Sequence, residues 1–245
     1  MSFWGKVGGA AGGWMLGGPL GAIAGALAGH YLVDRETDPE AEAAEERDRK
    51  SLAFTIGVIA LSAKMAKADG VVAPVEVEAF RKAFEIKPED LKEVSEVFDR
   101  ATYDVAGFES YARQLHDLFE GEPATLEDVL HSLAHIAAAD GAIHEAEVNY
   151  LMQVAEIFAL DRASVRRAFG RYVRLPEDDP YEILGAEPSA PTEELKRRHR
   201  TLVAENHPDR ALARGLPPAA VRVATSKLAA INAAWDAIRA ERSLA

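Results

Sequence analysis

An uncharged stretch from residue 7 to residue 33 sets the first limit on how this chain folds. As one helix it would be about 40 Å long, more than the roughly 30 Å of bilayer hydrocarbon. We therefore expect this stretch to be a membrane span in contact with lipid. Small residues in a stripe let a second backbone approach closely, so we also expect two spans to pair and form a homodimer. The stripe has a period of four: Gly9, Gly13, Gly17, Gly21, Gly25 and Gly29.

Two other interpretations of residues 1–33 stay open. A flexible glycine-rich tail on a soluble scaffold has the same composition, because glycine is a poor helix former in water. A cleaved signal peptide would use residues 26–28, Ala-Leu-Ala, as its small-residue cleavage site. The charges around the stretch do not by themselves fix its topology.

The rest of the chain predicts an all-α fold in several parts. Residues 34–50 are a charged connector, and residues 51–173 repeat apolar side chains at spacings of three and four without strand-like alternation. Residues 174–179 form a linker, and residues 180–245 form a C-terminal domain. Glycine and proline place the helix breaks of the middle part at 69–70, 87–88, 107, 121–123 and 140–141.

The net charge of −12 is unevenly distributed along these parts. The last 66 residues carry 10 basic and 8 acidic side chains, whereas the first 179 carry 18 basic and 32 acidic ones. The acidic total and the few cations of the C-terminal part disfavour a nucleic-acid partner. The absence of cysteine excludes a disulfide framework, a thiolate zinc site and a cysteine nucleophile.

The C-terminal part contains the most specific motif, His207-Pro208-Asp209, between two predicted helices. The first helix begins near 191–192, with Ser189 or Thr192 as its N-cap, and ends by His207, since a residue before proline is pushed out of the helical region. The second helix follows residues 217–218 and has an apolar seam that packs on the first: Ala224, Leu228, Ile231, Trp235 and Ile238.

Residues 179–241 resemble the J domain of the DnaJ/Hsp40 co-chaperones. The resemblance covers Tyr-Glu-Ile-Leu-Gly at 181–185, the basic first helix, the His-Pro-Asp motif and the stretch 231–235. It implies docking on an Hsp70 (DnaK-type) partner and stimulation of that partner's ATP hydrolysis, with no enzyme activity of its own. The family usually has a tyrosine where this chain has His199, which we expect to be a packing residue.

The expected docking residues also have a physical rationale. Pro208 fixes the backbone φ and makes the segment rigid, so Asp209 presents a carboxylate at a set angle to a partner cation. Basic side chains nearby attract an acidic partner surface. An acid–base pair of an enzyme, formed by His207 and Asp209, is disfavoured because no third partner is evident. The predicted Hsp70-binding set is His207, Pro208, Asp209, Lys196, Arg197, Arg200 and Arg210.

The middle part contains an internal repeat, in which Asp-Gly is followed by glutamate, seven residues after the aspartate. This pattern resembles the TerB-like, tellurite-resistance-associated helical domain over residues 50–173. The glutamates are typical of capping positions in the next helix, but the carboxylates of both repeats could also hold a divalent metal. An alternative function is therefore a metal- or stress-responsive sensor with the J domain as output. The candidate ligands are Asp69, Glu76, Asp140 and Glu147.

The order of these parts resembles the DjlA-like membrane-anchored co-chaperones of bacteria. Phe-Trp-Gly-Lys at 3–6 and Gly-Leu-Pro-Pro at 215–218 add to the resemblance. It implies a single pass through the bacterial inner membrane with the J domain in the cytoplasm, where an ATP-driven partner finds ATP. The client is not specified by the sequence.

Overall fold

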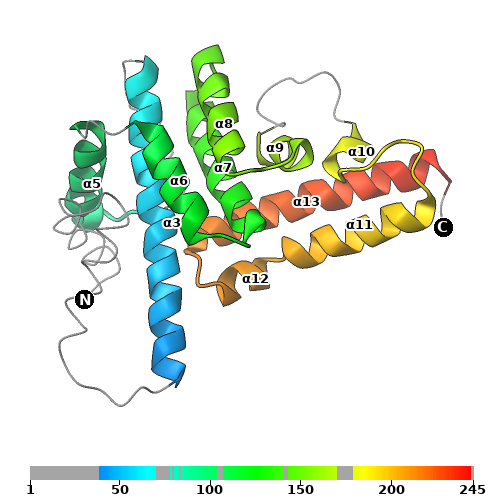
Figure 1. Cartoon of the computed structure of the whole chain (residues 1–245), viewed down its shortest axis with the longest axis horizontal. Coiled ribbons are helices and arrows are strands. Elements are labelled where there is room, and N and C mark those ends of the chain that lie inside the picture. The colour runs from blue at the N-terminus through cyan, green and yellow to red at the C-terminus, as the bar shows by residue number, and fades with distance from the viewer. Residues whose placement is uncertain are drawn as a thin grey trace.

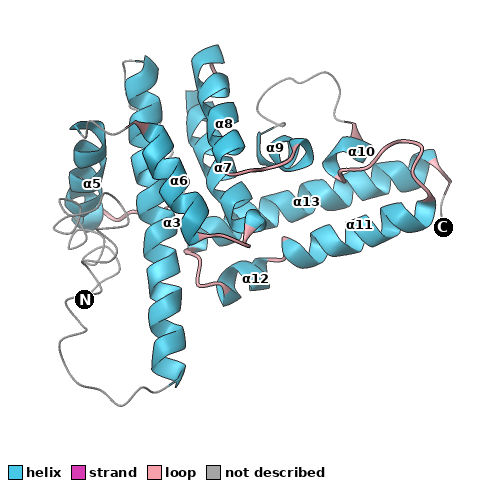
Figure 2. Cartoon of the chain, viewed as in Figure 1, coloured by secondary structure: helices cyan, strands magenta, loops and turns pink. Residues whose placement is uncertain are grey.

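The structure is a computed structural model, and it contains only helices and connecting loops in the part of the chain that it describes (Figure 2). This confirms the predicted all-α fold class. The predicted span, with the glycine stripe from Gly9 to Gly29, lies outside the described residues. None of the described helices is both long and apolar enough to cross a bilayer. The described residues are 39–69, 78, 80–82, 84–103, 107–140, 143–169 and 179–243.

A single long helix, α3 (Pro39–Asp69), forms the centre of the middle domain (Figure 1). Its first turns are rich in Ala, Glu and Arg, which are strong helix formers, and the described side chains there are mostly solvent-accessible. From Leu52 to Ala66 every residue is buried. Helix α3 runs without interruption through the predicted boundary at residues 50 and 51, so the connector is helical from Pro39 onward.

Seven further elements of the described residues complete the middle domain, and α3 packs against four of them: α5, α6, α7 and α8. The predicted breaks recur in the structure: α3 ends at Asp69, Gly107 precedes α6, and a proline begins both η1 and α7. The elements are η1 (Pro88–Asp90), α5 (Leu91–Tyr103), α6 (Phe108–Leu118), α7 (Pro123–Ala137), η2 (Ala138–Asp140), α8 (Glu145–Ile157) and α9 (Arg162–Phe169).

One break in the middle domain was not predicted, because neither glycine nor proline marks it. Helix α8 ends at Ile157, and Ala159 adopts a left-handed φ of +53°. The side chain of Asp161 then accepts a hydrogen bond from the backbone N–H of Ser164 at 2.8 Å. This aspartate caps the start of α9 and fixes the direction in which that helix leaves the turn.

The C-terminal part consists of α10 (Pro180–Ile183), α11 (Thr192–Glu205), α12 (Pro208–Ala213) and α13 (Pro218–Glu241). The predicted cap of α11 is wrong: the N-cap is Pro191, and no side chain caps this end. Thr192 is already the first helical residue, and Ser189 lies in the preceding turn, so neither hydroxyl is at the capping position. Helix α12 was not predicted either, because a motif of three residues gave no helical period.

Helices α11 and α13 pack antiparallel around a small apolar cluster. Leu195 of α11 and Ile231 and Ile238 of α13 are fully buried there, together with Tyr181 and Leu184. The ring of His199 stacks on Trp235 with centroids 5.1 Å apart. Its Nε2 lies 3.0 Å from Oδ1 of Asn232. His199 is therefore a packing residue, as expected from its place on the apolar face.

The seam of α13 is divided between two cores, which the sequence did not predict. Ile231 and Ile238 belong to the hairpin cluster, whereas Ala224 belongs to the core of the middle domain. Four other buried residues of the C-terminal part join that larger core: Ala211, Leu216, Ala219 and Ala220. The C-terminal hairpin is thus built onto the middle domain through α12 and the first half of α13 (Figure 1).

We expect residues 179–245 alone to be less stable than a chain of residues 39–245. Without the middle domain, the apolar side chains of α12 and the first half of α13 lose their cover, and that burial stabilises the fold. Thermal unfolding followed by circular dichroism should give the fragment a midpoint lower by roughly 10 °C or more. Equal midpoints would show that the shared core contributes nothing to the hairpin.

Candidate functional site

The His207-Pro208-Asp209 motif forms the first turn of α12. His207 is the N-cap residue, and its Nδ1 accepts a hydrogen bond from the backbone N–H of Asp209 at 3.2 Å. An accepting Nδ1 places the ring proton on Nε2. Pro208 occupies the first helical position, where its missing N–H leaves no hydrogen bond unmade. The motif is therefore a capped helix start with a fixed backbone.

The carboxylate of Asp209 points into solvent. Its side chain is 84% exposed, and Oδ2 lies 3.5 Å from Nδ1 of His207. His207 itself is half exposed. The arrangement presents one carboxylate and one imidazole on a short rigid helix, which suits contact with a cationic group of another macromolecule.

The basic residues of α11 differ in how they are paired. Lys196 contacts Glu193 at 3.0 Å, which is one turn away. Arg197 and Arg200 are exposed and form no ion pair within the described part of the chain. Among the described residues, Arg210 of α12 makes a single long contact, 3.5 Å, from Nη1 to the carbonyl oxygen of Ala204. Most of the predicted positive charge is thus solvent-exposed and free to attract an acidic surface.

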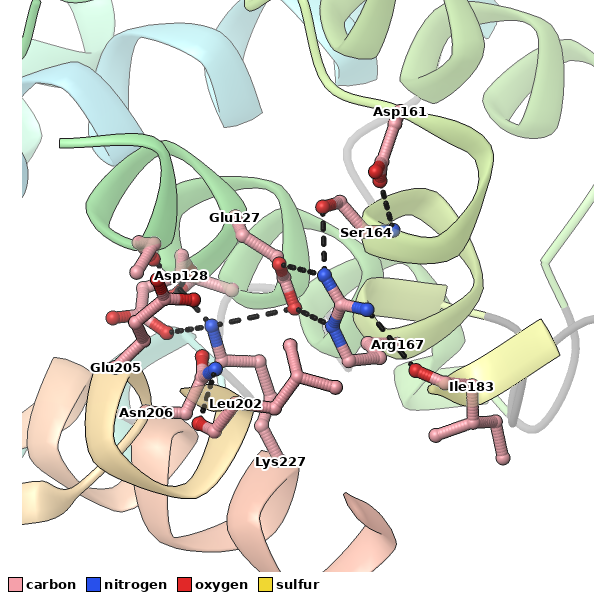
Figure 3. Close-up of polar contacts among 12 residues, drawn as sticks. Glu127, Asp128, Asp161, Ser164, Arg167, Ile183, Leu202, Glu205, Asn206 and Lys227 are labelled. Atoms are coloured by element: carbon pink, nitrogen blue, oxygen red, sulfur yellow. Dashed lines mark hydrogen bonds and ion pairs between the residues drawn. The ribbon is translucent and has the colours of Figure 1, made fainter. Parts of the chain in front are cut away.

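A second cluster of charges, buried rather than exposed, joins the hairpin to the middle domain (Figure 3). We call it the buried ion cluster: Glu127 and Asp128 of α7, Arg167 of α9 and Lys227 of α13. All four residues are buried, and Lys227 is only 1% exposed. Charged residues are rarely buried to this degree unless they are paired.

Arg167 makes the most extensive contacts in this cluster. Its Nε and Nη2 donate to the two carboxylate oxygens of Glu127, each at 3.0 Å, in the bidentate geometry that suits a guanidinium. Nη2 also contacts Oγ of Ser164 at 2.8 Å. Nη1 donates to the carbonyl oxygen of Ile183 at 3.0 Å. Arg167 therefore ties α7 and α9 to α10, the first helix of the C-terminal part.

Lys227 makes the corresponding tie for α13. Its Nζ lies 2.7 Å from Oδ1 of Asp128 and 3.5 Å from Oε1 of Glu127. The same ammonium lies 3.4 Å from the carbonyl oxygen of Ala124 in the first turn of α7. One buried cation of the hairpin is thus neutralised entirely by groups of the middle domain.

Comparison with known proteins gives two family matches and relatives that extend along the whole chain. Residues 55–169 match the family described as tellurite resistance protein TerB, and residues 1–51 match the one described as co-chaperone DjlA transmembrane domain. The co-chaperone protein DjlA of Shewanella oneidensis is 28% identical over 263 residues, which cover 100% of both chains. The chain is a DjlA-like co-chaperone with a TerB-like middle domain.

Two other relatives agree with this assignment. The co-chaperone protein DjlA of Coxiella burnetii is 27% identical over 200 residues, covering 74% of each chain. The protein of the same name from Vibrio cholerae is 44% identical over 66 residues, covering 27% of this chain and 23% of the relative. No solved structure matches the chain. The match to a transmembrane domain supports a membrane-anchored co-chaperone.

Only one of the four candidate metal ligands of the co-chaperone has a described side chain. Oε2 of Glu147, which is buried, accepts a hydrogen bond from the backbone N–H of His144 at 2.8 Å, so it caps α8. Asp69 and Asp140 end α3 and η2, but their side chains, like the whole of Glu76, lie outside the described residues. The described side chains contain no cluster of three or more metal-ligating groups. The metal site stays a prediction.

The two adjacent carboxyls of the buried ion cluster have opposite pKa shifts. Burial alone would raise the pKa of Glu127, but the charges of Lys227 and Arg167 outweigh it and hold that pKa below its usual value. For Asp128 burial is the larger effect, and it raises the pKa to about 6 despite the nearby Lys227. Glu127 is therefore the permanent anion of the cluster, and Asp128 titrates near neutral pH.

Sequence reasoning missed this cluster, although one signal was present. Lys227 lies three residues after Ala224 and four before Ile231, on the apolar seam itself. A lysine at a buried helical position predicts a carboxylate partner, but only the fold identifies that partner as Asp128. Glu127 and Asp128 likewise interrupt an apolar run in α7 whose residues from Thr125 to Ala134 are all buried.

We expect the Asp128→Asn variant to change how stability depends on pH. A folded pKa raised above the unfolded value contributes stability that is present below about pH 4 and lost as the pH rises to about 6. The unfolding free energy of the parent minus that of Asp128→Asn should therefore fall by on the order of 3 kcal/mol across this interval. Urea unfolding of residues 39–245 at several pH values measures it. A difference that stays constant would show that Asp128 has an ordinary pKa.

Proposed function

We propose that this co-chaperone docks on an Hsp70 (DnaK-type) ATPase through the His207-Pro208-Asp209 motif and stimulates its ATP hydrolysis. The observation that carries the proposal is the exposed carboxylate of Asp209 on a capped, rigid helix start. A group held in this way loses little conformational entropy when it pairs with a partner cation. The co-chaperone names of the relatives support the same kind of partner.

The basic face of α11 supports the approach to such a partner. Arg197 and Arg200 lie two and one helical turns before the end of α11, and both are exposed. Helix α11 lies on the side of α13 that faces away from most of the middle domain, so its outer face is open (Figure 1). Exposed charges of one sign raise the association rate with an oppositely charged surface, and salt weakens the effect.

We also propose where this activity takes place. The transmembrane match over residues 1–51 supports an anchor in contact with membrane lipid, and the partner needs ATP, so the docking motif belongs on the cytoplasmic side of a bacterial inner membrane. The glycine stripe of the anchor would bring two copies together. A dimer would present two docking motifs at one point of the membrane surface.

The substitution Asp209→Asn should abolish the stimulation of a bacterial DnaK-type ATPase. The amide has the same size and shape as the carboxylate, but it lacks the negative charge that pairs with the partner cation. In single-turnover ATP hydrolysis with the full chain in detergent micelles, we expect at least a roughly tenfold loss of stimulation. Helix content and melting temperature should stay unchanged, because the side chain is exposed.

Asp236→Asn is the matched control for this experiment. Asp236 is also an exposed aspartate, on α13, and it makes a long contact of 3.9 Å with Arg239 one turn away. This variant should stimulate as the parent does. If Asp209→Asn stimulates as well as Asp236→Asn, or if the parent chain does not accelerate hydrolysis, the proposed function is wrong.

A further inference from the structure

Helix α12, which begins with the docking motif, is held from behind by the middle domain. Ala211 lies two residues after Asp209, is only 2% exposed, and belongs to the core formed mainly by the middle domain. Leu216, just beyond the end of α12, is buried in the same core. The motif therefore stands on a helix whose inner face is part of another domain.

The turn that ends α12 lies directly against α3. Gly215 has a φ of +76°, and a Cβ added to it would lie 2.5 Å from Cβ of Arg47 and 2.6 Å from its Cα. No L-residue fits this position without moving α3 or the turn, because the nearest atoms include backbone. Arg47 lies within residues 1–51, the range of the transmembrane-domain match, so the matched region touches the segment that presents the motif.

The buried ion cluster lies behind the other end of the same segment. Asn206, the residue before His207, is buried, and Figure 3 draws it beside the pair formed by Lys227 and Asp128. Arg214, which caps the end of α12, is close enough for its charge to act on the carboxyl of Asp128. Its Nη2 also lies 3.4 Å from the carbonyl oxygen of Glu205. The motif lies between these residues in the chain.

We propose that Asp128 and Lys227 are positioning residues for the His207-Pro208-Asp209 motif. In this way the TerB-like domain holds the docking helix α12 in a fixed place. Neither residue touches the partner. Their ion pair fixes α13 on α7, and α13 together with α3 fixes α12. This inference rests on the docking function proposed above, and it assigns the middle domain a direct part in that function.

The physical basis is preorganisation. A docking segment that moves in the free protein must be ordered when the partner binds, and the lost entropy weakens binding. Held by Ala211, Gly215 and the Lys227–Asp128 pair, the segment is already ordered. A variant that weakens these contacts should therefore need a higher concentration of the co-chaperone for half-maximal stimulation. Its maximal stimulation should be lowered less.

The double variant Lys227→Met with Asp128→Asn tests this in the full chain. It removes the ion pair without leaving an unpaired buried charge, because Arg167 still neutralises Glu127, and replacements of this kind are commonly tolerated. We expect roughly tenfold faster amide hydrogen exchange at residues 207–214 and a roughly tenfold higher half-maximal concentration for ATPase stimulation. The variant Lys227→Arg, which keeps the charge, should behave more like the parent.

Tyr150→Phe is the control for a general loss of stability. It removes the buried hydrogen bond from the Tyr150 hydroxyl to the carbonyl oxygen of Leu61, at 2.8 Å, in the middle domain away from α12. Exchange at residues 207–214 should stay as in the parent. If Tyr150→Phe accelerates this exchange as much as the double variant, or if the double variant leaves the exchange or the half-maximal concentration unchanged, the proposal is overturned.

Two further outcomes are also decisive. If the double variant does not fold, Gly215→Ala replaces it, because that substitution separates the turn from α3 and leaves the ion cluster intact. It should also accelerate the exchange at residues 207–214 and raise the half-maximal concentration. Unchanged values would show that the middle domain does not position the motif. If the parent chain gives no stimulation, the docking function fails, and the exchange rates alone decide whether the middle domain positions the motif.

Discussion

The ammonium group of Lys227 is the constraint on which the arrangement of the two domains depends. A lysine of the C-terminal hairpin is buried, and its carboxylate partners both come from α7 of the middle domain. Desolvating such a charge costs several kcal/mol, and only close, well-directed partners offset that cost. Separating the hairpin from the middle domain would take Lys227 away from Asp128 and Glu127, so the ion cluster specifies one orientation of the hairpin.

In that orientation three separate segments of the sequence lie in contact: the end of the transmembrane match, the TerB-like core and the segment of the docking motif. Helix α3 begins within residues 1–51, which match a transmembrane domain, and it forms the centre of the TerB-like core. The same helix touches the turn at Gly215, next to the docking helix α12. The middle domain and the docking motif are therefore linked through packed contacts and not only through the connecting chain.

The part of this design that could be predicted from sequence is local. Glycine and proline mark most helix ends, as at Gly107 and Pro123, because their backbone preferences act within one turn. The docking motif and the seam at Ile231 and Ile238 were evident for the same reason. The break at Ala159 was missed because a non-glycine residue adopts there the left-handed φ that glycine usually supplies at a helix end.

What could not be predicted depends on contacts between distant residues. Asp128 and Lys227 are 99 positions apart, and no period or motif connects them. The division of the α13 seam between two cores has the same origin, since Ala224 and Ile231 look equivalent in the sequence but face different neighbours. The predicted N-cap of α11, Ser189 or Thr192, is wrong because the N-cap is Pro191, which lies between these two residues. The carboxylates proposed for metal lie mainly outside the described side chains.

The most direct test of this account is the distance between the two domains in solution. The chain contains no cysteine, so spin labels on Gln153→Cys in α8 and Ala237→Cys in α13, both exposed positions, report on that distance alone. Pulsed electron paramagnetic resonance on the labelled chain should give a single narrow distance distribution, and the Lys227→Met and Asp128→Asn double variant should broaden it. A broad or multiple distribution in the parent would contradict a docking motif seated on the middle domain.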